Sequence, residues 1–163
     1  MCTGVKTTYI STKDREYQED WRILLALAEK LNSAGIAFKV DGGTMIFAHG
    51  MDFKLEKICL TFKWDEEQRI IDFFGYKGKA DSSYQPGFKY FDSAFEGMKI
   101  RCMFFGDCPS DETDAFLYHN ADVVIADGQT LHVQTVEFYI ENAEPRKRNE
   151  FYQQVCEWAK NRT

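Results

Sequence analysis

The dipeptide Asp127-Gly128 separates two alternating apolar segments, and it constrains the fold more than any other feature of the sequence. The flanking segments are residues 123–126 and 130–133. Asp and Gly tolerate the two positive φ angles of a type I′ turn, whose twist matches that of paired antiparallel strands. The sequence therefore predicts a β-hairpin at this point, and the chain must contain at least one pair of antiparallel strands.

Helical and extended patterns alternate along the rest of the chain. An apolar stripe predicts a helix at residues 19–32 and consists of Trp21, Leu24, Leu25, Ala28 and Leu31. Further helices are predicted at 44–49, 66–74, 136–142 and 148–160, and strands at 37–41, 57–62, 88–91 and 99–105. Asp65 and Gln68 predict a capping box at the start of the 66–74 helix. This order predicts an α+β fold, a mixed β-sheet with helices mainly on one face.

The chain of 163 residues has the length of one domain, so we predict a single domain over residues 1–163. Residues 1–16 are polar and show no clear periodicity, and we expect them to form a flexible N-terminal segment. No run approaches the roughly 18 apolar residues of a membrane span, and no signal-peptide pattern is present. We therefore expect a cytoplasmic protein that does not contact the membrane.

Charge and cysteine content narrow the range of partners. The net charge of -6 argues against non-specific nucleic-acid binding, which depends on neutralising phosphates with Lys and Arg, although a small basic patch is compatible with it. The five cysteines are odd in number, are scattered and form no C-x-x-C pair. This pattern is typical of reduced thiols and gives no support to a zinc site.

The first half of the chain carries a characteristic order of elements. A helix and a strand lead to Gly42-Gly43, a short helix ends at Gly50, and a strand at 57–62 and a helix at 66–74 follow. This order resembles the minimal nucleotidyltransferase group of the DNA polymerase β-like superfamily, which includes lincosamide nucleotidyltransferases and enzymes of toxin-antitoxin and abortive-infection systems. The hairpin, the helix after it and the basic run 146–148 before a final helix are also similar to that group.

The resemblance implies a site that this chain has altered. In the family a Gly-Gly turn lets the backbone approach nucleotide phosphates, and carboxylates at i and i+2 of a strand, with a third on a later strand, hold two Mg²⁺ ions. The alignment of the glycines puts Lys57 and Cys59 at the first two acidic positions, and Arg101 or Met103 near the third. None of these is a hard oxygen ligand, so we expect no metal to bind there.

The candidate nucleotide-binding or anion-binding residues are therefore Gly42, Gly43, Lys57, Cys59 and Arg101, and no residue is assigned to catalysis or to a metal. Each has a simpler interpretation that remains open. The glycines can serve only a tight turn, the two cations can lie on a solvated strand face, and the thiol can be a buried and unreactive one.

Three hypotheses follow for the function. The leading one is a catalytically inactive nucleotidyltransferase-like domain that binds a protein partner or a nucleotide or other anion without a cofactor. The second is an active Mg²⁺-dependent nucleotidyltransferase that uses Glu56, Asp52 or Asp41 instead. The third is a ligand-free regulatory or interaction protein, for example a homodimer. The aromatic residues of 84–105 either fill the core or, where they are exposed, suggest an interface.

Overall fold

A computed structural model describes residues 5–106 and 117–162 of the chain, and within these residues seven strands form one mixed sheet in the order β1-β6-β7-β2-β3-β5-β4. The strands are β1 (Thr7–Ile10), β2 (Lys39–Asp41), β3 (Lys57–Lys63), β4 (Phe88–Phe95), β5 (Met98–Phe105), β6 (Ala121–Ala126) and β7 (Gln129–Gln134). The α-helices are α1 (Gln18–Ser33), α2 (Gly42–Ala48), α3 (Glu67–Phe74), α4 (Val136–Asn142) and α5 (Glu150–Lys160). The predicted α+β fold with a mixed sheet is confirmed.

Parallel and antiparallel pairs alternate across the sheet. The pairs β1/β6, β2/β7 and β3/β5 are parallel, and β6/β7, β2/β3 and β4/β5 are antiparallel. The predicted hairpin is present between β6 and β7, and its turn residues Asp127 and Gly128 have φ angles of 48° and 83°. These are the two left-handed conformations that a type I′ turn requires.

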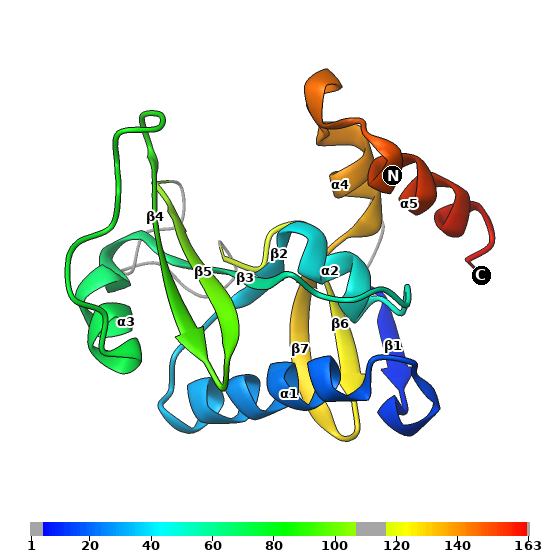
Figure 1. Cartoon of the computed structure of the whole chain (residues 1–163), viewed down its shortest axis with the longest axis horizontal. Coiled ribbons are helices and arrows are strands. Elements are labelled where there is room, and N and C mark those ends of the chain that lie inside the picture. Colours follow the sequence, from blue (N-terminus) through cyan, green and yellow to red (C-terminus); the bar gives the residue numbers. More distant parts are fainter. Residues whose placement is uncertain (1–4, 107–116, 163) are drawn as a thin grey trace.

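The two ends of the molecule carry different elements (Figure 1). Helix α3 and the β4–β5 hairpin lie at one end of the molecule, and α4 and α5 lie at the other. Helices α1 and α2 meet in the core, where the rings of Trp21 and Phe47 are 4.7 Å apart. Ile58, Leu60 and Phe62 of β3 are fully buried in the same core. No helix in the described ranges is long and apolar enough to cross a membrane.

The expectation of a flexible segment over residues 1–16 is wrong for its described part. Residues 7–10 form β1, which pairs with β6 at the edge of the sheet, and Ile10 is buried. The carboxylate of Asp122 accepts a hydrogen bond of 3.0 Å from the backbone N–H of Lys6, which fixes the start of the strand. Of the four residues Thr7–Ile10 only Ile10 is a buried apolar side chain, so the segment has no hydrophobic alternation that would predict a strand.

The capping box predicted for the 66–74 helix is also absent. Residues Trp64–Glu66 form a short 3₁₀ turn, and α3 begins one residue later, at Glu67, without a side-chain cap. Gln68 donates instead to Asp72 one turn along the helix, at 2.9 Å. Because the 3₁₀ turn includes Asp65, this residue is no longer at the N-cap position.

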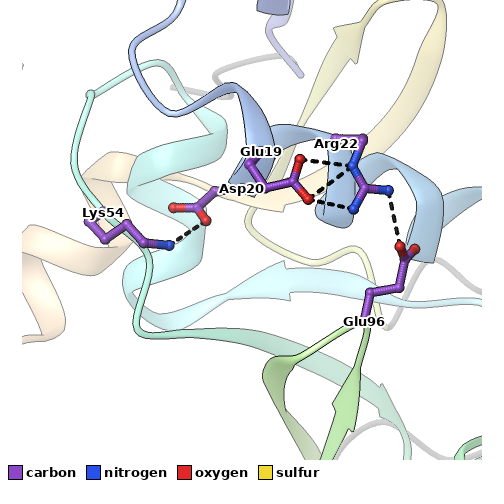
Figure 2. A network of polar contacts seen from close by, with 5 residues as sticks. All are labelled: Glu19, Asp20, Arg22, Lys54 and Glu96. Atoms are coloured by element: carbon purple, nitrogen blue, oxygen red, sulfur yellow. Dashed lines mark hydrogen bonds and ion pairs between the residues drawn. The ribbon is translucent and has the colours of Figure 1, made fainter.

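Helix α1 holds two distant segments in place through polar contacts (Figure 2). The buried carboxylate of Asp20 contacts the ammonium of Lys54 and accepts a hydrogen bond of 3.0 Å from the backbone N–H of Leu55. Arg22 contacts Glu19 on its own helix and Glu96 in the β4–β5 turn, the latter at 3.0 Å. The helix thus anchors both the segment before β3 and the tip of the hairpin.

We predict that Asp20→Ala lowers the free energy of unfolding by about 1 to 3 kcal/mol, because the buried N–H of Leu55 loses its acceptor. Urea denaturation measures the change. Glu19→Ala is the matched control on the same helix, and its effect should be much smaller because its ion pair with Arg22 is solvent-exposed. Equal losses in the two variants would show that Asp20 does not anchor the segment.

Candidate functional site

The turn from β2 into α2 is built around Asp41. Its carboxylate accepts a hydrogen bond of 2.8 Å from the backbone N–H of Gly42 and one of 3.0 Å from the hydroxyl of Thr61. The side chain therefore caps α2 and links the turn to β3. Of the carboxylates considered as alternative metal ligands, this one is already occupied by structural contacts.

Gly42 and Gly43 have different roles in this turn. Gly42 has a φ of +58°, and a Cβ atom placed on it would lie 3.0 Å from Sγ of Cys59, so both the backbone and the packing require glycine. Gly43 has no positive φ, and a Cβ atom placed there would meet nothing within 4 Å. Gly42 is therefore structural, whereas Gly43 borders open space.

The hydroxyl of Thr44 forms hydrogen bonds with the backbone of β3 at the point where β2 no longer pairs with it. Its hydroxyl donates to the carbonyl of Lys57 at 3.1 Å and accepts from the N–H of Cys59 at 2.9 Å. Strand β2 pairs with β3 only from Asp41 opposite Cys59 onward, so a side chain replaces the ladder at this point. On the β2 side, the backbone near Lys57 is therefore satisfied without a neighbouring strand, which leaves room for a cavity.

A cavity of about 510 Å³ opens between this turn, the segment before β3 and the two C-terminal helices. Its walls combine aromatic rings with polar groups, and they include Phe53, Tyr139, Phe151, Gly43, Thr44, Lys57, Cys59 and Asn149. The rings of Phe53 and Phe151 meet edge to face at 5.0 Å. Sites for small molecules typically combine an apolar wall with a few polar groups in this way.

Two lysines border the cavity, and they differ in their contacts. Lys54 is held by the carboxylate of Asp20. Among the residues that the structure describes, no carboxylate lies within 4 Å of the ammonium of Lys57, which is only partly exposed. Lys57 is therefore the cation that is available to a ligand in this cavity.

The strand register places Arg101 beside Cys59, but the side chain of Arg101 pairs with a carboxylate on the next strand. Asp41, Cys59, Arg101 and Asp92 form one row across β2, β3, β5 and β4. The guanidinium of Arg101 makes a bidentate contact with Asp92, at 2.9 and 3.0 Å, and does not line the cavity. The structure thus brings Gly43, Lys57 and Cys59 together around the cavity and leaves Arg101 on the adjoining strand face.

These surroundings shift the pKa values of Asp92 and Cys59 in opposite directions. The hydrogen bonds from Arg101 lower the pKa of Asp92, so this carboxylate stays ionised and neutralises much of the guanidinium charge. Burial raises the pKa of the Cys59 thiol, although the nearby ammonium of Lys57 acts in the opposite direction. The thiol is therefore a protonated packing group near neutral pH and not a nucleophile.

These residues do not fit the Mg²⁺ ions that the resemblance implies. At the positions that the resemblance assigns to the three acids, the chain has Lys57, Cys59 and either Arg101 or Met103, and none of these side chains offers the oxygen ligands that Mg²⁺ requires. Asp52 lies 3.9 Å from Arg15 and Asp41 caps α2, so two of the three alternative carboxylates have other contacts. Across residues 5–106 and 117–162, no three His, Cys, Asp or Glu side chains converge to hold a metal.

Sequence reasoning did not identify three contributors to the site. Asp92 orients Arg101, Thr44 completes β3, and Phe53 forms the aromatic wall. Only Thr44 carried a usable signal, because it directly follows the Gly-Gly turn and a hydroxyl is a frequent backbone partner near a helix N-terminus. The other two depend on strand register and on the packing of separate segments.

Comparison with known structures identifies the fold. The lincosamide antibiotic adenylyltransferase LnuA, in its lincomycin-bound crystal structure, aligns with a TM-score of 0.64 at 12% identity and covers 87% of this chain and 97% of that chain. TM1012 from Thermotoga maritima, assigned as a nucleotidyltransferase, aligns with a TM-score of 0.61 at 17% identity, over 88% and 94%. No family model and no curated protein matches the sequence. The chain has a nucleotidyltransferase-like fold, as its sequence predicted.

The two glycines give a matched test of the turn. We predict that Gly42→Ala lowers the free energy of unfolding by about 1 to 3 kcal/mol, because the new methyl group is strained and meets the Cys59 thiol. Gly43→Ala should leave stability unchanged or raise it by less than about 1 kcal/mol, since alanine restricts the unfolded chain. Thermal or urea denaturation of both variants measures this, and similar effects in the two would contradict the assigned roles.

Cys59 should resist alkylation in the folded protein. At about pH 8 its buried thiol remains protonated, whereas an ordinary cysteine is partly ionised, so iodoacetamide should label it many-fold more slowly than in the denatured chain. Peptide mass mapping follows each cysteine separately, with the partly exposed Cys156 as an internal control. Rapid labelling of Cys59 would show that the thiol is accessible and ionised.

Proposed function

We propose that the protein binds a nucleotide or a related phosphate-bearing anion in the cavity beside Gly43, without a divalent metal, and that it does not catalyse nucleotidyl transfer. The single observation that carries the proposal is the ammonium of Lys57, which borders a cavity with aromatic walls and has no carboxylate partner in the described residues. A fixed cation of this kind provides charge-assisted hydrogen bonds to phosphate oxygens.

The shape of the cavity supports a ligand that has both a ring and an anionic group. Phe53, Tyr139 and Phe151 form an apolar wall, and Lys57 and Asn149 add polar groups to the same space. Gly43 leaves the start of α2 open, so a ligand can approach the backbone there. A nucleotide has the planar base and the phosphates that such a combination favours.

The charges at the metal position support binding without transfer. A divalent ion about 4 Å from one lysine would experience a repulsion of roughly 8 kcal/mol at an effective dielectric constant of 20, twice the value for two unit charges. Glu56 also borders the cavity, but it stands alone there as a carboxylate. One carboxylate does not replace the set that holds two ions in a nucleotidyl-transfer site.

Isothermal titration tests the proposal. We predict that ATP binds equally well with Mg²⁺ and with a chelator, and that Lys57→Gln weakens binding at least about tenfold, as expected for loss of a charge-assisted hydrogen bond. Lys77→Gln, which changes an exposed lysine outside the cavity, should leave the affinity unchanged.

Three results would contradict the proposal: binding that requires Mg²⁺, transfer of label from a radioactive nucleotide to an acceptor, and the absence of any nucleotide or pyrophosphate binding. If transfer were seen and Glu56→Gln abolished it, the protein would be an active enzyme with a non-standard carboxylate. If no nucleotide or pyrophosphate bound, the cavity would not be an anion site.

A further inference from the structure

A cluster of aromatic side chains occupies the outer face of the β4–β5 hairpin. Phe88 and Tyr90 lie two residues apart on β4 and point to the same face, with ring centroids 5.9 Å apart and planes inclined by 20°. The ring centroid of Phe88 lies 5.0 Å from that of Phe105 on β5 and 6.2 Å from that of Tyr84. These rings are partly or largely exposed, and they are not needed for the core.

The other face of the same strands already supplies the core. Phe91, Cys102 and Phe104 are buried there, and Tyr76, just after α3, stacks on Phe91 at 4.5 Å. Because side chains alternate along a strand, the outer rings belong to a separate surface. This surface lies on the side of the molecule that carries β4, β5 and α3, away from the helices α4 and α5 (Figure 1).

Cations accompany the rings although the chain is acidic overall. The guanidinium of Arg101 lies 4.9 Å from the centre of the Tyr90 ring, and Lys99 lies two residues away on the same face of β5. These two cations share the one carboxylate of Asp92, which leaves an excess of positive charge. Arg146, whose charge is paired with Glu144, also donates to the hydroxyl of Tyr84 at 3.0 Å.

We infer that this outer face of β4 and β5 binds a single-stranded polynucleotide, with bases stacked on Phe88 and Tyr90 and phosphates beside Lys99 and Arg101. Sheet-borne aromatics with adjacent cations are the arrangement by which proteins bind unpaired bases. Two nearly parallel rings on alternate residues offer stacking surfaces to successive bases. Register also places Lys99 beside Lys57, so positive charge continues from the hairpin toward the cavity.

Charge complementarity favours a polynucleotide over a protein partner. Two cations, Lys99 and Arg101, face a single carboxylate on this surface, and phosphate groups complement that excess of positive charge. The excess of cations is local, since the net charge of the whole chain is -6. Binding should therefore be confined to this face and should weaken steeply as salt is added.

Fluorescence anisotropy with labelled oligouridylate and oligothymidylate of about eight nucleotides tests the inference, and a duplex of equal length serves as the control ligand. We expect one or both single strands to bind more tightly than the duplex. Comparison of oligouridylate with oligothymidylate shows whether RNA or DNA is preferred. The double variant Phe88→Leu and Tyr90→Leu keeps apolar volume but removes the stacking surfaces, and should weaken binding at least about tenfold. Lys99→Gln, which removes the more exposed of the two cations that share Asp92, should make the salt dependence shallower by about one unit of slope.

Matched controls separate this site from the rest of the molecule. Tyr9→Leu removes an exposed ring on the edge strand β1, at the far end of the strand order, and should leave oligonucleotide affinity unchanged. The ring variants should also keep the ATP affinity of the cavity, so failure of one site is distinguishable from failure of the other. The inference is overturned if no single strand binds at low salt, if Tyr9→Leu and the ring variants lose affinity equally, or if the rings instead prove to hold a protein partner or a second copy of the chain.

Discussion

The register between β3 and β5 determines the chemistry of the centre of this molecule. It sets Cys59 directly beside Arg101, while β2 sets Asp41 on the other side of Cys59 and β4 sets Asp92 beyond Arg101. A shift of one residue would turn these side chains to the core face and replace them with apolar ones. The sheet therefore holds a thiol and a guanidinium side by side where the fold, as the family resemblance describes it, holds carboxylates.

Two side chains of this row, Cys59 and Arg101, have structural partners that stabilise them. The thiol of Cys59 fills the space left by the missing side chain of Gly42. Arg101 is neutralised by Asp92, whose pKa is lowered by the same contact, so the pair stays charged at physiological pH. Lys57 alone keeps an ammonium without a carboxylate partner among the described residues. Positive charge therefore remains at the cavity, where a nucleotidyl-transfer site would bind positive ions.

Much of the fold was predictable because local signals and tertiary structure agree. The Asp127-Gly128 turn and the apolar stripe of α1 each have one strong interpretation, and both predictions are confirmed. Strand β1 escaped prediction because Thr7–Ile10 contains one buried apolar residue and no alternation, and its position depends on Asp122, more than 100 residues away. The resemblance also pointed to Lys57 and Cys59, and both line the cavity, but it did not reveal that Arg101 is paired with Asp92.

The most direct test of this account is a crystal soaked in Mn²⁺, with anomalous scattering used to locate the ion. The account predicts no manganese within coordination distance of Lys57, Cys59 or Arg101, because an ammonium, a protonated thiol and a paired guanidinium provide no suitable ligands. An anomalous peak bound between β3 and β5 would contradict it and would indicate that the fold has kept a working metal site.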